Sequence, residues 1–318
     1  MMTFKMFTTI WAKNTHKKHL IAGAFYFIFS LLAVGQIPTF RFQSIGGTPA
    51  HSLPYFQKYI GKQASTADFD LQMQVKEFEF KSKDLFQFHA DIFVVRDTIS
   101  GPQLLYSYKS QFKTQGYKSK AEHGEEMAKL SSQSLSERFN AWWKNNWDRD
   151  PKLIQEVRVD FLPDYLPQKA EEDTLFYGQK TLDWGDFKSK SYPGSRFAAQ
   201  IFSNFEYHAF PKIEKGILYL PIQVKVYMLR SHSWKKENLP DRALEHELTH
   251  FKITHQAAQQ FKDQIKRMKL RPLWYDSELQ WWFLDAYRWM NNTQKTYDTE
   301  TGHGIHPVEQ EKWNDKFR

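Results

Sequence analysis

Residues 246–250 read His-Glu-Leu-Thr-His, a spacing that can hold a divalent metal ion. Residues four apart lie on one face of an α-helix, so the imidazoles of His246 and His250 can reach the same ion. Glu247, beside the first histidine, would then lie close to the water that the metal activates. The pattern therefore predicts a zinc site with Glu247 as general base; the alternative is a helix that carries two histidines by accident.

The segment around this motif has the pattern of a long amphipathic helix. Apolar residues recur at helical spacing from Leu244 to about residue 269, and Arg271-Pro272 ends the run. Asn238 is expected to cap the start of the helix. His255 falls roughly opposite His246 on the helical wheel, so we expect a packed core histidine there and no third metal ligand.

Composition excludes several kinds of site. The 318 residues contain no cysteine, which excludes disulfides, thiolate metal ligands and cysteine nucleophiles, so His, Asp or Glu must hold any metal. The formal net charge is +8, and the four lysines within residues 1–35 account for half of it. The remaining charge, without a long basic cluster, gives no reason to expect a nucleic-acid partner.

Residues 1–35 have the pattern of a secretory signal peptide. A basic front region precedes an apolar run from Leu20 to Val34, about 15 residues against the ~20 that a spanning helix needs. Small residues predict cleavage after Gly35, and an uncleaved anchor in the inner membrane is the alternative. In either case we expect an exported protein, in the periplasm or outside the cell. It would meet the membrane only if this segment stays uncleaved, and then only through this segment.

Hydrophobic periodicity predicts an α+β fold in which antiparallel strands pack on long helices. Residues 36–65 show no sustained period and are expected to be irregular. The predicted elements are a hairpin of residues 86–94 and 104–108, a helix over 122–147, a second hairpin of residues 198–209 and 217–229, the motif helix, and another helix over 276–291. The last residues are expected to form a short polar tail. These elements define an N-terminal α+β region over residues 36–172, of unknown role, and a C-terminal domain over residues 173–318.

The C-terminal half resembles the DUF922 family of bacterial proteins, described as predicted secreted zinc-dependent proteases. The matching pieces are Leu182-Asp183-Trp184-Gly185-Asp186-Phe187, Ala198-Ala199, Ser233-Trp234, Leu244-Glu245-His246-Glu247 with His250-Phe251-Lys252-Ile253, and Tyr297-Asp298 with Thr301-Gly302-His303-Gly304. They cover residues 173 to 318 in the expected order. The chain departs from the family pattern at Thr249, where members commonly carry glycine.

A catalytic zinc usually takes three protein ligands and one water. The resemblance points to His303 as the third ligand, since its segment matches the family and its neighbours Gly302 and Gly304 allow close approach of the backbone. Asp298 is the next candidate. Glu278 would suit an arrangement in which a second helix supplies a carboxylate.

The remaining expected roles support the metal. Tyr297 is a candidate donor to the oxyanion that develops on the substrate. Asp183, Asp186 or Asp298 is expected to accept the second ring N–H of a ligating histidine. The predicted function is a zinc-dependent peptidase with a peptide or protein substrate. Two alternatives stay open: a non-catalytic binding or scaffold protein of the envelope, and a metal-dependent hydrolase of a cell-wall amide.

Overall fold

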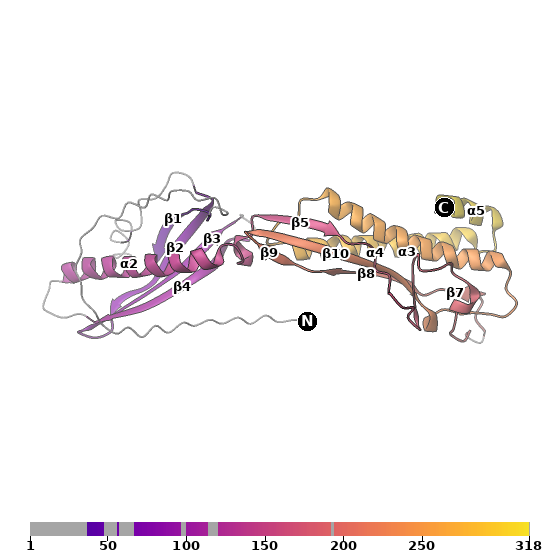
Figure 1. Ribbon diagram of the computed structural model, residues 1–318, viewed down its shortest axis with the longest axis horizontal. Helices are drawn as coiled ribbons and strands as arrows, with labels where there is room; N and C mark the ends of the chain where they lie inside the picture. Colours follow the sequence, from indigo (N-terminus) through magenta and orange to yellow (C-terminus); the bar gives the residue numbers. More distant parts are fainter. Residues whose placement is uncertain are drawn as a thin grey trace. The chain divides into compact units, whose positions relative to one another are not determined.

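The computed structural model describes residues 37–47, 56, 67–96, 100–113, 120–191 and 194–317, so the expected signal peptide lies outside it. The fold is α+β, as predicted (Figure 1). Within the described ranges, no helix combines the length and the apolar character needed to cross a membrane. Two separate hydrophobic cores organise the described residues.

The first core lies between a four-stranded sheet and helix α2 (Lys120–Asn146). The strands are β1 (Phe40–Gly47), β2 (Phe69–Phe80), β3 (Leu85–Val95) and β4 (Pro102–Lys113), in the order β1-β2-β3-β4. Antiparallel β3 and β4 confirm the first predicted hairpin. The expectation of irregular structure over residues 36–65 is wrong at β1, which pairs in parallel with β2.

The second core includes a sheet built around one long strand, β10 (Ile217–Leu229). Its partners are β5 (Glu156–Phe161), β6 (Thr174–Phe176), β8 (Ser203–Ala209) and β9 (Lys212–Glu214). β8 and β10 are antiparallel and confirm the second predicted hairpin. β5 pairs in parallel with β10, so this sheet is mixed and includes a strand that precedes residue 173.

A small two-stranded sheet joins β7 (Ala199–Gln200) to β11 (Trp234–Lys235). The sequence predicts one strand over residues 198–209, but the structure divides it into β7 and β8. At the break, the backbone N–H groups of Ile201 and Phe202 donate to the side chains of Glu247 and Ser233 and not to a neighbouring strand. Short 3-10 turns complete the chain: η2 (Pro151–Leu153), η3 (Trp184–Asp186) and η4 (Arg230–His232).

Three helices end the chain: α3 (Asp241–Arg267), α4 (Tyr275–Thr301) and α5 (Pro307–Lys316). α3 packs on β8 and β10 and along α4 (Figure 1). The predicted cap at Asn238 is wrong, because α3 begins three residues later and Asn238 has a left-handed backbone with φ of 55°. α4 ends ten residues later than predicted, at Thr301 with Gly302 as its C-cap, and α5 replaces the expected polar tail.

Candidate metal centre

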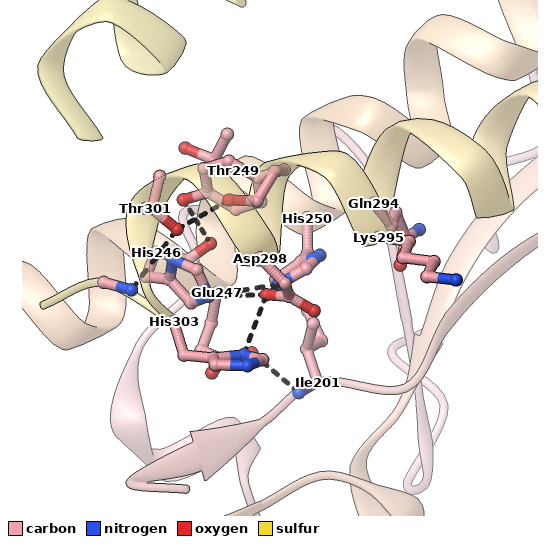
Figure 2. Close-up of polar contacts among 12 residues, drawn as sticks. Ile201, His246, Glu247, Thr249, His250, Gln294, Lys295, Asp298, Thr301 and His303 are labelled. Carbon is pink, nitrogen blue, oxygen red and sulfur yellow. Dashed lines mark hydrogen bonds and ion pairs between the residues drawn. The ribbon is translucent and has the colours of Figure 1, made fainter. Parts of the chain in front are cut away.

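Two turns of helix bring three potential ligand atoms together. Nε2 of His246 and Nε2 of His250, one turn apart on α3, lie 3.2 Å from each other. Oδ1 of Asp298, in the last turn of α4, lies 3.1 Å from the first nitrogen and 3.0 Å from the second (Figure 2). The packing of α4 along α3 therefore produces a triangle of two nitrogens and one oxygen.

This triangle fits a zinc ion in its dimensions and in its chemistry. Tetrahedral zinc with bonds of about 2.0–2.1 Å places neighbouring ligand atoms about 3.3 Å apart. The observed separations of 3.0–3.2 Å are close to that value. Two imidazoles and one carboxylate are also a recurrent ligand set of catalytic zinc, which leaves a fourth position for water or substrate.

The expected third ligand, His303, lies beside this triangle and is not part of it. Its Nδ1 is 3.4 Å from Oδ1 of Asp298, its side chain is 43% exposed, and its ring packs against Phe197. Figure 2 shows the imidazole on the side of Asp298 that faces Ile201. The alternative candidate Asp298 thus takes the place that the resemblance assigned to His303.

Glu278 is excluded as a ligand by its position on α4. It lies in the first turn, 20 residues before Asp298, which is about 30 Å along a helix. Its carboxylate accepts hydrogen bonds from the guanidinium and backbone N–H of Arg271.

Glu247 is buried beside the triangle, with 4% of its surface exposed. Oε2 accepts a hydrogen bond of 2.8 Å from the backbone N–H of Ile201, which fixes the orientation of the carboxylate (Figure 2). Burial raises the pKa of Glu247, against the opposing attraction of the two imidazoles. A carboxylate with a raised pKa is a stronger base, which is the property that the expected role requires.

The Ser233-Trp234 piece of the sequence holds Ile201 in place. The buried hydroxyl of Ser233 accepts from the N–H of Phe202 at 2.9 Å and donates to the carbonyl of Leu229 at 2.7 Å. Nε1 of Trp234 donates to the side chain of Gln200 at 3.2 Å, beside the pairing of β11 with β7. These contacts fix the backbone on both sides of the N–H that reaches Glu247.

Within the triangle, the negative charge of Asp298 and the positive charge of a protonated histidine stabilise one another. Burial by itself would raise the pKa of Asp298, but hydrogen bonds from His246 and His250 hold that pKa well below its ordinary value. Burial by itself would lower the pKa of His246, but the bond to Asp298 and the charge of Glu247 raise it overall. The carboxylate of Asp298 is therefore ionised and available to a cation.

The position of Tyr297 does not fit the expected role of oxyanion donor. Its side chain is fully buried, its ring stacks on the ring of His246, and burial strongly raises its pKa. The hydroxyl lies 3.2 Å from the carbonyl oxygen of His246 and 2.6 Å from Nε2 of Gln310. The hydroxyl of Tyr297 therefore makes its hydrogen bonds on the side of His246 that carries Nδ1. Nε2, the nitrogen that faces Asp298, lies on the other side of the ring.

Asp183 and Asp186 do not accept from a metal-binding histidine either. Asp183 caps the turn η3, where its Oδ1 accepts from the N–H of Gly185. Asp186 is buried and pairs with Arg230 at 3.0 Å and with Lys180 at 2.8 Å. The group that contacts the second nitrogen of His246 is instead Gln310 of α5. No sequence pattern indicated this residue, because the end of the chain was expected to be a polar tail.

Comparisons with known proteins do not place the chain in a characterised family. No family model and no curated protein matches it. A solved structure described as a candidate lipoprotein from Caulobacter crescentus is similar at 12% identity, over 32% of this chain and 92% of that chain, with a TM-score of 0.22. A likeness at that level carries no argument about fold or function. The resemblance to the DUF922 family stays a prediction.

Proposed function

We propose that this protein is a zinc-dependent hydrolase that cleaves amide bonds of peptides. The observation that carries the proposal is the triangle of His246, His250 and Asp298 with Glu247 buried beside it. The first two side chains and the carboxylate of Asp298 would hold the ion. Zinc in this position would polarise a substrate carbonyl and lower the pKa of water to about 7.

Glu247 would perform the proton transfers. Its carboxylate takes a proton from the attacking water as the water oxygen bonds to the carbonyl carbon. The same proton then passes to the amide nitrogen as the C–N bond breaks, which yields a carboxylic acid and an amine. The hydrogen bond from Ile201 holds the carboxylate in one orientation during both transfers, so little reorganisation is needed.

The proposed place of action is outside the cytoplasm, in the cell envelope or the medium. Its support is the basic and apolar pattern of residues 1–35. Mass spectrometry of the protein purified from its native cells tests this: a chain that begins at Gln36 is expected. A cytoplasmic chain that retains residues 1–35 would contradict export.

The activity is tested by loading the purified full chain with zinc and supplying two substrate sets, a mixed peptide library and cell-wall fragments that contain amide bonds. New amine termini in the peptide library are expected. They should disappear when a chelator removes the metal and return when zinc is restored. Cleavage of the cell-wall fragments alone would replace the peptidase by the cell-wall amide hydrolase. A zinc-loaded protein that cleaves neither set would favour a binding or scaffold protein.

A further inference from the structure

We propose that Gln310, on the C-terminal helix α5, is a positioning residue that holds the ring of His246 with its proton on Nδ1 and its Nε2 lone pair toward the metal site. The effect of Gln310 on metal affinity rests on the proposed function, whereas its effect on the proton position in the His246 ring does not. Gln310 itself lies outside the H-E-x-x-H motif and outside every piece of the family resemblance.

Hydrogen bonds link His246, Gln310 and Tyr297 in a closed ring. Nδ1 of His246 lies 3.0 Å from Oε1 of Gln310. Nε2 of Gln310 donates to the hydroxyl of Tyr297 at 2.6 Å, and the one proton of that hydroxyl has two acceptors within reach, the carbonyl of His246 at 3.2 Å and Oε1 of Gln310 at 2.9 Å. All three residues are at least 94% buried, so water does not compete with these bonds.

The orientation of the Gln310 amide follows from its other partner. Nε2 also donates to Oδ1 of Asn314 at 2.8 Å, so both of its protons are used. Oε1 must then face the imidazole of His246, and a carbonyl oxygen only accepts. The ring nitrogen Nδ1 therefore carries a proton both in the charged ring, whose Nε2–H donates to Asp298, and in the neutral ring, whose Nε2 is unprotonated. This is the tautomer that binds a metal through Nε2.

His250 provides a contrast within the same site. Its Nδ1 is buried and has no hydrogen-bond partner among the described residues. The protein therefore fixes the ring proton of the first motif histidine and not that of the second. His246 is the ligand whose orientation depends on a separate element of the fold.

Helix α5 is held where Gln310 can act. Trp313 is buried against Tyr297, and its Nε1 donates to Glu300 at 2.7 Å. Asn314 also accepts from the hydroxyl of Thr249 at 2.9 Å. Thr249 stands where the resembling family commonly has glycine, so this contact between α3 and α5 uses a side chain that glycine would not supply.

The position of the ring proton of His246 is measured in the zinc-free, full-length Asp298→Ala variant. The substitution removes the carboxylate that otherwise competes with Gln310 for this proton. Nitrogen NMR of labelled histidine distinguishes a protonated ring nitrogen from an unprotonated one. We expect the neutral ring of His246 to carry its proton on Nδ1, and added Gln310→Leu to shift the population toward Nε2–H. A neutral ring protonated on Nε2 with Gln310 intact would overturn the inference, and this spectrum decides it even if Gln310→Leu does not fold.

The consequence is measured as zinc affinity with Asp298 intact. Loss of an outer partner of a ligating histidine lowers metal affinity about 10–100-fold, and Gln310→Leu is expected to fall in that range. Gln310→Glu keeps an acceptor for Nδ1 and should restore most of the affinity, whereas a merely structural role would not be rescued in this way. The matched control is Glu311→Ala, an exposed neighbour on α5, which should leave affinity unchanged. Folded Gln310→Leu with wild-type affinity would overturn the positioning role. A wild type that binds no zinc would instead refute the proposed function, and the spectrum would still decide the proton position.

Discussion

The 3.2 Å between Nε2 of His246 and Nε2 of His250 is a close approach of two buried ring nitrogens. Neither nitrogen has bulk water around it, and both face the same oxygen of Asp298. Two lone pairs at this distance repel one another unless a proton or a cation lies between them and the oxygen. The arrangement is therefore suited to hold a positive charge, and the proposed function assigns that charge to zinc.

Replacing Glu247 by glutamine should separate metal binding from catalysis. Glutamine keeps an oxygen for the N–H of Ile201 but lacks a basic carboxylate. We expect unchanged zinc content and a fall in kcat of about 10²–10⁴. The matched control is Glu245→Gln, an exposed position two residues earlier on α3, which should retain full activity. Activity that survives in Glu247→Gln would remove Glu247 from the mechanism.

A methyl group at Gly304 should disturb His246 directly. Gly304 has φ of 81°, and an added Cβ would lie 3.3 Å from both Cβ and Cγ of His246. Gly304→Ala should cost about 1–2 kcal/mol of stability from backbone strain and should also weaken zinc binding. Gly178→Ala is the control, because its φ is 84° and an added Cβ meets no atom within 4 Å. Thermal unfolding of both variants measures the backbone strain that they share, and zinc titration measures the contact with His246 that only Gly304→Ala makes. Equal zinc affinity in the two variants would contradict this account.

His255 should make the protein sensitive to acid. Its ring stacks on Tyr177, and burial lowers its pKa from the ordinary value of 6.5. Below pH 6.5 the unfolded chain takes up a proton that the folded ring resists, so this contribution to stability is complete above pH 6.5 and is lost as the pH falls. Urea unfolding at several pH values should show that the free energy of unfolding falls less steeply with falling pH in His255→Phe, which keeps the stacked ring. The same loss in both proteins would show that His255 is not the cause.

Asp186 should contribute to stability and not to metal binding. Its removal leaves the guanidinium of Arg230, 11% exposed, without its carboxylate partner. Breaking such a buried pair costs about 3 kcal/mol or more. Asp183→Ala removes an exposed cap and an exposed ion pair with Lys180, and it should cost about 1 kcal/mol. Unfolding free energies of the two variants test this order, and zinc stoichiometry in folded Asp186→Ala should equal that of the wild type. A loss of zinc from the folded variant would assign Asp186 to the metal centre.

Local pattern predicted two strand pairs and the long helices but not the place where they meet. The periodicity of residues 244–269 predicts α3 because one face of that helix is buried along its length, and the same holds for the strand pairs β3–β4 and β8–β10. The end of α4 was missed because residues 292–301 are polar and lack an apolar stripe, although no glycine or proline interrupts them before Gly302. This extension places Asp298 on a helix that packs against α3.

The contacts of α5 depend on tertiary packing that sequence spacing does not report. Its residues are mostly polar, and only Gln310 and Trp313 are buried. Pro307 was a local signal for a helix start, since proline is favoured in the first helical turn. The partner of Gln310, however, lies 64 residues earlier in the chain. No periodicity connects two positions at that separation.

Zinc binding by three full-length chains tests the central claim most directly: the wild type, Asp298→Ala and His303→Ala. The geometry predicts about one tightly bound zinc per wild-type chain and per His303→Ala chain. Asp298→Ala should lose affinity by more than the roughly 100-fold of an outer-partner change, because a direct ligand is gone. A wild type without zinc affinity, or a site emptied by His303→Ala but not by Asp298→Ala, would contradict the assignment of His246, His250 and Asp298 as the metal ligands.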